Sequence, residues 1–242
     1  MRAIATLLVA MTAQAEQQPA ARVEFEVVSV KRGDPADPSS SGRGTPGGLE
    51  LRNATLNTLV RSAYSLHEYQ LDGGPKWADS TRFHIDGKFP AGSSREQGPL
   101  MLQSMLADRF KLEFHRETRS LREYALVVAK GGPKLQPATE RDPRRGASSQ
   151  GPRQIKGWGI TVSTLARMLM SAVGAPVVDQ TGLTGEYNFI LEFAPLTEGP
   201  RPDETLPAIF VVLQEQLGLK LEPIRGPVDV LVIDRAELPS EN

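Results

Sequence analysis

The feature that most constrains the fold is a succession of helix and strand patterns that occurs twice along the chain. In each half, apolar side chains first recur at the i, i+3, i+4, i+7 spacing of one helix face and later alternate as in a half-buried strand. Short strings also agree: TLNTL at 55–59 matches TVSTL at 161–165, and KLE occurs at both 111–113 and 220–222. The first helix stripes of the two halves comprise Leu56, Leu59, Val60 and Ala63, and Val162, Leu165, Ala166 and Leu169.

Internal repetition has to be considered before local detail, because a missed repeat leads to the wrong fold. The sequence therefore predicts an α+β fold of two related repeats, each a small, mainly antiparallel sheet with two helices packed on one face. The alternative is a coincidence between similar amphipathic patterns.

Residues 131–157 separate the two halves and contain very few apolar side chains. A segment of this composition buries too little apolar surface to order itself. The sequence therefore predicts a first repeat over 22–130, a flexible linker over 131–157 and a second repeat over 158–238. On this interpretation, proteolysis within 131–157 would leave two folded fragments.

The first 15 residues follow the order of a secretory signal peptide. Arg2 gives a positive start, residues 3–11 are an apolar run, and Ala13-Gln14-Ala15 offers small residues for cleavage. The run is shorter than the ~20 apolar residues that cross a bilayer. We therefore expect cleavage near Ala15 and a periplasmic or secreted protein that is not membrane-spanning. The alternative is a buried N-terminal helix.

The charge balance and the lack of cysteine exclude several functions. Lys and Arg number 28 against 29 Asp and Glu, whereas nucleic-acid-binding domains are usually basic. With no cysteine, the chain can form no disulfide, thiolate nucleophile or iron–sulfur cluster. The glycine-rich segment at 131–134 contains a proline, which removes an amide donor that a phosphate loop needs. We expect no nucleic-acid partner, no metal and no cofactor.

Four residues are candidates for catalysis. His84 and Asp86 alternate along one predicted strand and share a face, so the carboxylate could orient the imidazole as a general base. Asp179 and Glu186 lie beside predicted turns and could supply paired carboxylates. The alternatives are a solvated polar face for the first pair and a turn hydrogen bond from the backbone after Asp179. No Gly-x-Ser-x-Gly elbow occurs.

A further group on one predicted strand face comprises Glu113, His115 and Glu117. Neighbours at i and i+2 lie about 7 Å apart, so three of them do not converge on one ion. Ion pairs with nearby arginines are the better interpretation.

Trp77 and Trp158 are the candidates for ligand binding. Each lies beside a glycine-rich turn, where an aromatic ring could stack on a sugar or anchor a partner. The alternative is that each ring closes the end of its own domain.

Several long motifs resemble those of a known family: GGPKW at 73–77, LADRFKL at 106–112, YALVVAKGGPKL at 124–135, VDQTGLTG at 178–185 and LQEQLGLKLE at 213–222. The chain resembles the soil-associated, Solibacter-type secreted proteins of Acidobacteria, which are built on a domain of unknown function. The resemblance covers nearly all of the chain after residue 15. It implies export and gives no catalytic residues.

Related domains follow BlaR-type membrane peptidase sensors, and the helix–strand units are similar to the signalling domain of secretins and TonB-dependent receptors. The resemblance thus implies an exported, non-catalytic binding or sensing module of the cell envelope. Its expected partner is an envelope protein, a peptide or a cell-wall component, bound by strand addition or on a sheet face. The alternative is an extracytoplasmic hydrolase of polysaccharides or esters, with the catalytic candidates in a cleft between the repeats.

Overall fold

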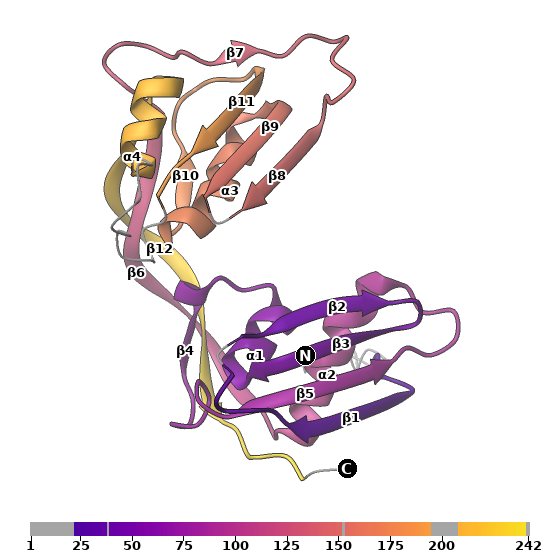
Figure 1. Ribbon diagram of the computed structural model, residues 1–242. Helices are drawn as coiled ribbons and strands as arrows, with labels where there is room; N and C mark the ends of the chain where they lie inside the picture. Colours follow the sequence, from indigo (N-terminus) through magenta and orange to yellow (C-terminus); the bar gives the residue numbers. More distant parts are fainter. Residues whose placement is uncertain (1–21, 38, 152, 195–207, 241–242) are drawn as a thin grey trace, which may run out of the picture.

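The computed structural model describes residues 22–37, 39–151, 153–194 and 208–240, and these residues form two lobes joined by a long two-stranded ribbon (Figure 1). The predicted α+β class is confirmed, because strands and helices are mixed along the chain. The predicted signal peptide lies outside the described residues. The strands are β1 (Val27–Arg32), β2 (Ser41–Thr45), β3 (Gly48–Thr55), β4 (Leu71–Gly73), β5 (Arg82–Lys88), β6 (Glu113–Val128), β7 (Gln136–Pro137), β8 (Ala147–Gly151), β9 (Gln154–Thr161), β10 (Val177–Asp179), β11 (Glu186–Glu192) and β12 (Leu219–Arg235). The helices are α1 (Leu56–Tyr64), α2 (Gly98–Arg109), α3 (Val162–Val173) and α4 (Ile209–Val212), with short 3₁₀ or π turns η1 (Glu68–Gln70), η2 (Arg95–Gln97) and η3 (Leu213–Leu217).

Lobe 1 consists of an antiparallel sheet, sheet A, with strand order β1-β5-β3-β2, and of the helices α1 and α2 (Figure 1). The Thr55 hydroxyl caps α1 by accepting a hydrogen bond from the Thr58 N–H (3.2 Å). The expected helix stripe of α1 is confirmed, since its four side chains are at most 1% exposed. They pack with the apolar side chains of α2 and with Phe83 and Ile85, which alternate along β5.

Lobe 2 contains a second antiparallel sheet, sheet C, with strand order β7-β11-β9-β8. The Thr161 hydroxyl caps α3 as Thr55 caps α1, by accepting from the Thr164 N–H (3.2 Å). Strands in equivalent positions of sheets A and C also follow one another in the same order along the chain. The apolar stripes of α3, α4 and η3 form one core with Phe189 and Leu191 of β11.

The ribbon of β6 and β12 belongs to both lobes. The two strands pair antiparallel from Leu219 opposite Val128 to Arg235 opposite Glu113. Strand β10 of lobe 2 lies parallel to the end of β6, and β4 of lobe 1 lies parallel to the end of β12. Each long strand therefore begins in the lobe that precedes it in the sequence and ends in the other lobe, as Figure 1 shows.

The cores show the same exchange. Leu126 from the end of β6 is fully buried in the core of lobe 2, whereas Leu231 and Ile233 from the end of β12 are buried in the core of lobe 1. The predicted limits of the halves need correction for this reason. Residues 124–128 complete lobe 2, and residues 228–235 complete lobe 1.

The predicted linker over 131–157 is wrong, because this segment contains β7, β8 and the first residues of β9. Backbone hydrogen bonds order this segment, and such bonds do not depend on the apolar content of the sequence. The Lys134 N–H donates to the Leu217 carbonyl and the Ala138 N–H to the Glu186 carbonyl, each at 2.8 Å. The lobes are joined by the ribbon and not by this segment.

The ribbon carries two prolines midway between the lobes. Pro223 and Pro227 lie opposite Tyr124 and Ser120, in a part of β12 that pairs with β6 on one side only among the described residues. Proline has no N–H to donate, so it is tolerated in a strand where one edge lacks a partner. Within the described ranges, no helix combines the length and the apolar character needed to cross a membrane.

Candidate functional site

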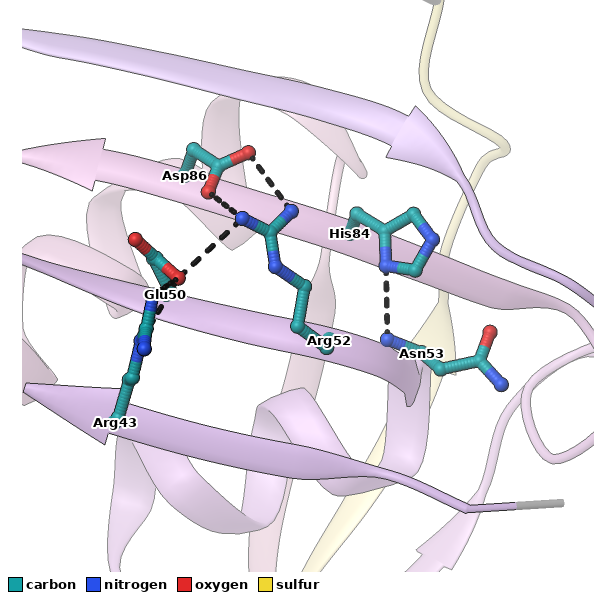
Figure 2. Close-up of polar contacts among 6 residues, drawn as sticks. All are labelled: Arg43, Glu50, Arg52, Asn53, His84 and Asp86. Atoms are coloured by element: carbon teal, nitrogen blue, oxygen red, sulfur yellow. Dashed lines mark hydrogen bonds and ion pairs between the residues drawn. The ribbon is translucent and has the colours of Figure 1, made fainter. Parts of the chain in front are cut away.

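The six residues that the sequence selects do not gather at one place in the molecule. His84 and Asp86 share the face of sheet A opposite its helices, as predicted (Figure 2). The other four are Trp77 beside the core of lobe 1, Asp179 at the end of β10, Glu186 at the start of β11, and Trp158 on β9.

His84 and Asp86 each have a partner other than one another. The backbone N–H of Asn53 donates to His84 Nδ1 at 3.1 Å, and Arg52 binds both carboxylate oxygens of Asp86 at 2.9 and 3.2 Å (Figure 2). In this bond Nδ1 presents its lone pair to the Asn53 N–H. The lone pair that a general base needs is therefore occupied.

The remaining charges of this face form a chain of ion pairs. Arg52 also lies 3.3 Å from Glu50, which accepts two hydrogen bonds from Arg43 at 2.7 and 3.0 Å (Figure 2). The hydrogen bond from Arg43 is the main reason that the pKa of Glu50 lies below its ordinary value. Glu50 is thus held ionised by exposed arginines, an arrangement that contributes little stability.

The position of His84 follows from a local irregularity of β3. Asn53 has a left-handed backbone (φ 55°), a conformation that asparagine tolerates better than most residues, and it lies where the pairing of β3 with β5 shifts register. Its side-chain amide donates to the carbonyls of Asp37 (2.6 Å) and Ser39 (3.1 Å), and its own carbonyl accepts from Arg82 (3.0 Å). His84 thus supplies the acceptor for the backbone N–H of the buried residue Asn53.

We expect His84→Ala to destabilise the protein by about 1–3 kcal/mol, because the Asn53 N–H loses its acceptor. Urea unfolding followed by circular dichroism measures this change. Lys31→Ala is the matched control, since Lys31 is exposed and lies opposite His84 on β1. An equal effect of both variants would contradict this structural role.

The carboxylate of Asp179 accepts the turn hydrogen bond that was predicted as the alternative to a catalytic role. Its carboxylate accepts from the Thr181 N–H (3.0 Å), the Thr181 hydroxyl (2.7 Å) and the Ser163 hydroxyl (2.8 Å). Burial by itself would raise the pKa of Asp179, but these hydrogen bonds outweigh it and lower the pKa. Lobe 1 has a similar contact, in which the Asn57 amide donates to Asp79 at 2.6 Å. Asp179 therefore ties the start of α3 to the turn after β10.

Glu186 and Trp77 also have partners within their own lobes. Glu186 forms an ion pair with Arg145. The Trp77 ring packs edge-on against the Phe83 ring, with centroids 6.2 Å apart, beside the core of lobe 1. Neither of these contacts involves another of the candidates.

On the ribbon, His115 Nδ1 lies 2.8 Å from Asp234, and Glu117 pairs with Arg119, as the ion-pair interpretation of this strand predicts. Arg119 also binds Asp72 of β4 at 2.5 Å. In the part of the chain that the structure describes, no three His, Asp or Glu side chains gather as a metal site would require.

Among the predicted residues, Asp86 lines a cavity at sheet A, and Trp158 lines another one. This cavity, of about 410 Å³, opens beside sheet C and has an apolar floor from Phe189, Ile190 and Leu217. Its polar lining comprises amide and cationic side chains together with the indole: Lys134, Gln136, Arg144, Trp158, Asn188 and Gln216.

The cations of the cavity are fixed by neighbours. The Arg144 guanidinium lies over the Trp158 ring, 5.0 Å from its centroid, and binds both oxygens of Asp142 at 3.1 Å. That hydrogen bonding raises the pKa of Arg144 and lowers the pKa of Asp142. Lys134 donates to the Glu215 carbonyl at 3.0 Å, and Asn188 accepts from the Gly159 N–H at 2.8 Å. An aromatic face, amides and oriented cations suit a polar, anionic ligand.

Most of this cavity was missed by sequence reasoning. Lys134, Gln136 and Arg144 lie in the segment predicted as a linker, and Asn188 and Gln216 come from β11 and η3. These residues have no common spacing, because sheet pairing brings them together. The signals in the sequence were the tryptophan after a glycine and the cluster of arginines at 141–153, to which Arg144 belongs.

Comparison with known proteins found one family. The family model described as "Protein of unknown function (DUF3738)" matches residues 57–236, from the start of α1 to the end of β12. Searches of curated proteins and of solved structures found no match. The matched residues span three quarters of the chain and include most of both cores, so the chain belongs to the DUF3738 family of proteins of unknown function.

Proposed function

We propose that this protein is an exported, non-catalytic binding module of the cell envelope, and that its cavity beside sheet C holds an acidic saccharide of the cell wall. One observation carries the proposal: Arg144, Lys134 and the Trp158 ring meet amide side chains over an apolar floor. An indole packs on the C–H face of a sugar, amides bind its hydroxyl groups, and cations bind its carboxylate. Export rests on the signal-peptide pattern of residues 1–15.

The hydrolase alternative requires catalytic groups that converge. His84 and Asp86 lie on β5, Asp179 on β10 and Glu186 on β11. Hydrogen bonds or ion pairs to neighbouring residues engage all four. These separate surroundings argue for a binding role.

We also propose that the two lobes are related repeats that exchange their last strands. Sheets A and C share one strand order, and α1 and α3 share a threonine cap. In this proposal β6 and β12 are equivalent strands, and each ends in the lobe of the other repeat. The exchange would keep the saccharide cavity of lobe 2 attached to lobe 1 by two strands.

The test uses N-acetylmuramic acid and N-acetylglucosamine. These two cell-wall sugars differ by one lactyl group, which carries a carboxylate and is present only in N-acetylmuramic acid. We expect N-acetylmuramic acid to bind at least about tenfold more tightly, a difference of roughly 1.4 kcal/mol. Isothermal calorimetry measures the affinities. Because the chain has 2 tryptophans, fluorescence of a Trp77→Phe variant reports binding at Trp158 alone.

Two variants assign the binding to the cavity. Arg144→Gln should remove the preference for the acidic sugar, and Trp158→Ala should weaken both sugars. Arg141→Gln is the control, since Arg141 is exposed and does not line the cavity. Equal affinity of the two sugars for the unaltered protein, or an unchanged preference in Arg144→Gln, would overturn the proposal.

A further inference from the structure

A second cavity, of about 470 Å³, lies where the two lobes face one another. Its walls come from α1 and η1 of lobe 1 and from the last turn of α3 in lobe 2. The Tyr69 hydroxyl contacts the Met170 sulfur at 3.7 Å across the boundary between the lobes. Its lining includes the side chains of Thr58, Arg61, His67, Tyr69, Met170 and Ser171.

One side of this cavity is rich in hydrogen-bond donors. Arg61 supplies a guanidinium, and Thr58, Ser62 and Ser171 supply hydroxyl groups. The carboxylate near Arg61 belongs to Glu68, whose oxygen is 3.7 Å away and whose side chain is 93% exposed. Since a fully solvated carboxylate at that distance forms a weak pair, the guanidinium remains available to an anion.

The other side of the cavity is built from rings and apolar groups. The His67 and Tyr69 rings stack with centroids 5.2 Å apart and planes 8° apart, and Leu66 and Met170 lie beside them. Burial, together with the charge of Glu123, raises the pKa of Tyr69 to about 12. The phenol therefore keeps its proton at physiological pH and can donate a hydrogen bond.

We infer that this cavity is a second ligand site, which takes a small aromatic carboxylate. The carboxylate fits the fork of Arg61 and the hydroxyl groups near it, because a guanidinium binds two carboxylate oxygens at once. The ring fits beside the His67–Tyr69 stack and the Met170 sulfur, both of which pack favourably against aromatic rings. This cavity has no lining residue in common with the cavity beside sheet C.

Occupancy of this site has a structural consequence. Arg61 and Tyr69 come from lobe 1, while Met170 and Ser171 come from lobe 2, so one ligand contacts both lobes. A bound molecule would thus add a connection between the lobes to the one that the ribbon provides. Binding would favour the orientation in which Tyr69 and Met170 are in contact.

The test is an NMR titration of the full ¹⁵N-labelled chain with sodium benzoate, compared with sodium acetate and benzyl alcohol. Acetate carries the charge without the ring, and benzyl alcohol carries the ring without the charge. We expect saturable benzoate binding, with shifts at Arg61, Tyr69 and Ser171 and none at Trp158. Each of the other two compounds should bind at least about tenfold more weakly.

Variants of the full chain test which side chains bind the probe. Arg61→Gln should lower benzoate affinity at least about tenfold, and Tyr69→Phe should lower it by a smaller factor. Arg167→Gln, on the exposed side of α3 and outside the cavity, should leave affinity unchanged. Should Arg61→Gln fail to fold by circular dichroism, Arg61→Lys, which keeps the charge and loses the planar fork, replaces it with the same expected direction.

The site assignment is overturned by absence of saturation up to the solubility limit of benzoate, by shifts confined to one lobe, or by unchanged affinity in the folded Arg61 variant. None of these results affects the saccharide proposal, because the muramic acid test measures sugar binding at Arg144 and Trp158, which line a different cavity. The two proposals can therefore fail independently.

Discussion

Deletion of residues 228–242 is expected to unfold lobe 1, although most of lobe 1 precedes residue 113. The deletion removes Leu231 and Ile233 from the core of lobe 1 and takes away the strand that pairs with β4 and with the first half of β6. Loss of one buried leucine costs about 2–5 kcal/mol, and the total stability of a domain is about 5–15 kcal/mol. The free energy lost with two core side chains and a strand should therefore exceed the total stability of lobe 1. Residue-resolved NMR of the truncated protein measures the outcome.

Cleavage within 139–146 provides the comparison, because this exposed segment between β7 and β8 contributes no core side chain. We expect the two fragments to stay associated in gel filtration and to separate only in denaturant, since β6 and β12 hold 15 residue pairs between Leu219 and Ile233. This differs from the two independent fragments that the sequence predicts. A fragment of residues 22–130 that folds alone would contradict the exchange of strands.

The second large effect is expected at Gly218. This residue ends the turn η3 with a left-handed backbone (φ 64°), and a methyl group there would overlap the carbonyl oxygen of Gly132 and lie 2.9 Å from the Lys134 nitrogen. Backbone atoms cannot move aside as the end of a side chain can. We expect Gly218→Ala to destabilise the protein by more than about 4 kcal/mol, at the high end for a single substitution.

Gly174 is a close control for this substitution. It ends α3 with nearly the same backbone angles (φ 64°, ψ 26°, against ψ 27° at Gly218), but a methyl group there would meet nothing within 4 Å. Gly174→Ala therefore isolates the conformational cost of a left-handed alanine, about 1–2 kcal/mol. Thermal and urea unfolding of both variants gives the difference. Similar losses at the two positions would show that Gly218 and Gly132 do not approach closely.

The four main helix stripes could be predicted because each helix buries one face, and that burial leaves a period in the sequence. The stripes of α1 and α3 are buried in the cores, as are Ile209, Val212, Leu213 and Leu217 of α4 and η3. The segment at 131–157 could not be predicted in this way. Its strands β7 and β8 lie at an edge of sheet C and are exposed, so they need no apolar alternation and are ordered by backbone pairing.

The candidate site shows the same division. Periodicity placed His84 and Asp86 on one face correctly, but it could not show that Asn53 and Arg52 are their partners, because a register shift in β3 decides those contacts. Of the two tryptophans, only Trp158 lines a cavity, and the arginine over its ring comes from the segment predicted as a linker.

The sequence by itself determined the α+β class, the buried faces of the helices and the turn at Asp179, since each depends on residues close together in the chain. Only the tertiary structure decided which half completes which lobe. Strands β6 and β12 have alternating side chains compatible with either lobe, and the choice depends on a pairing between residues about 100 positions apart. That pairing also positions the cavity between the lobes, because the long strands connect the lobe that holds α1 to the lobe that holds α3.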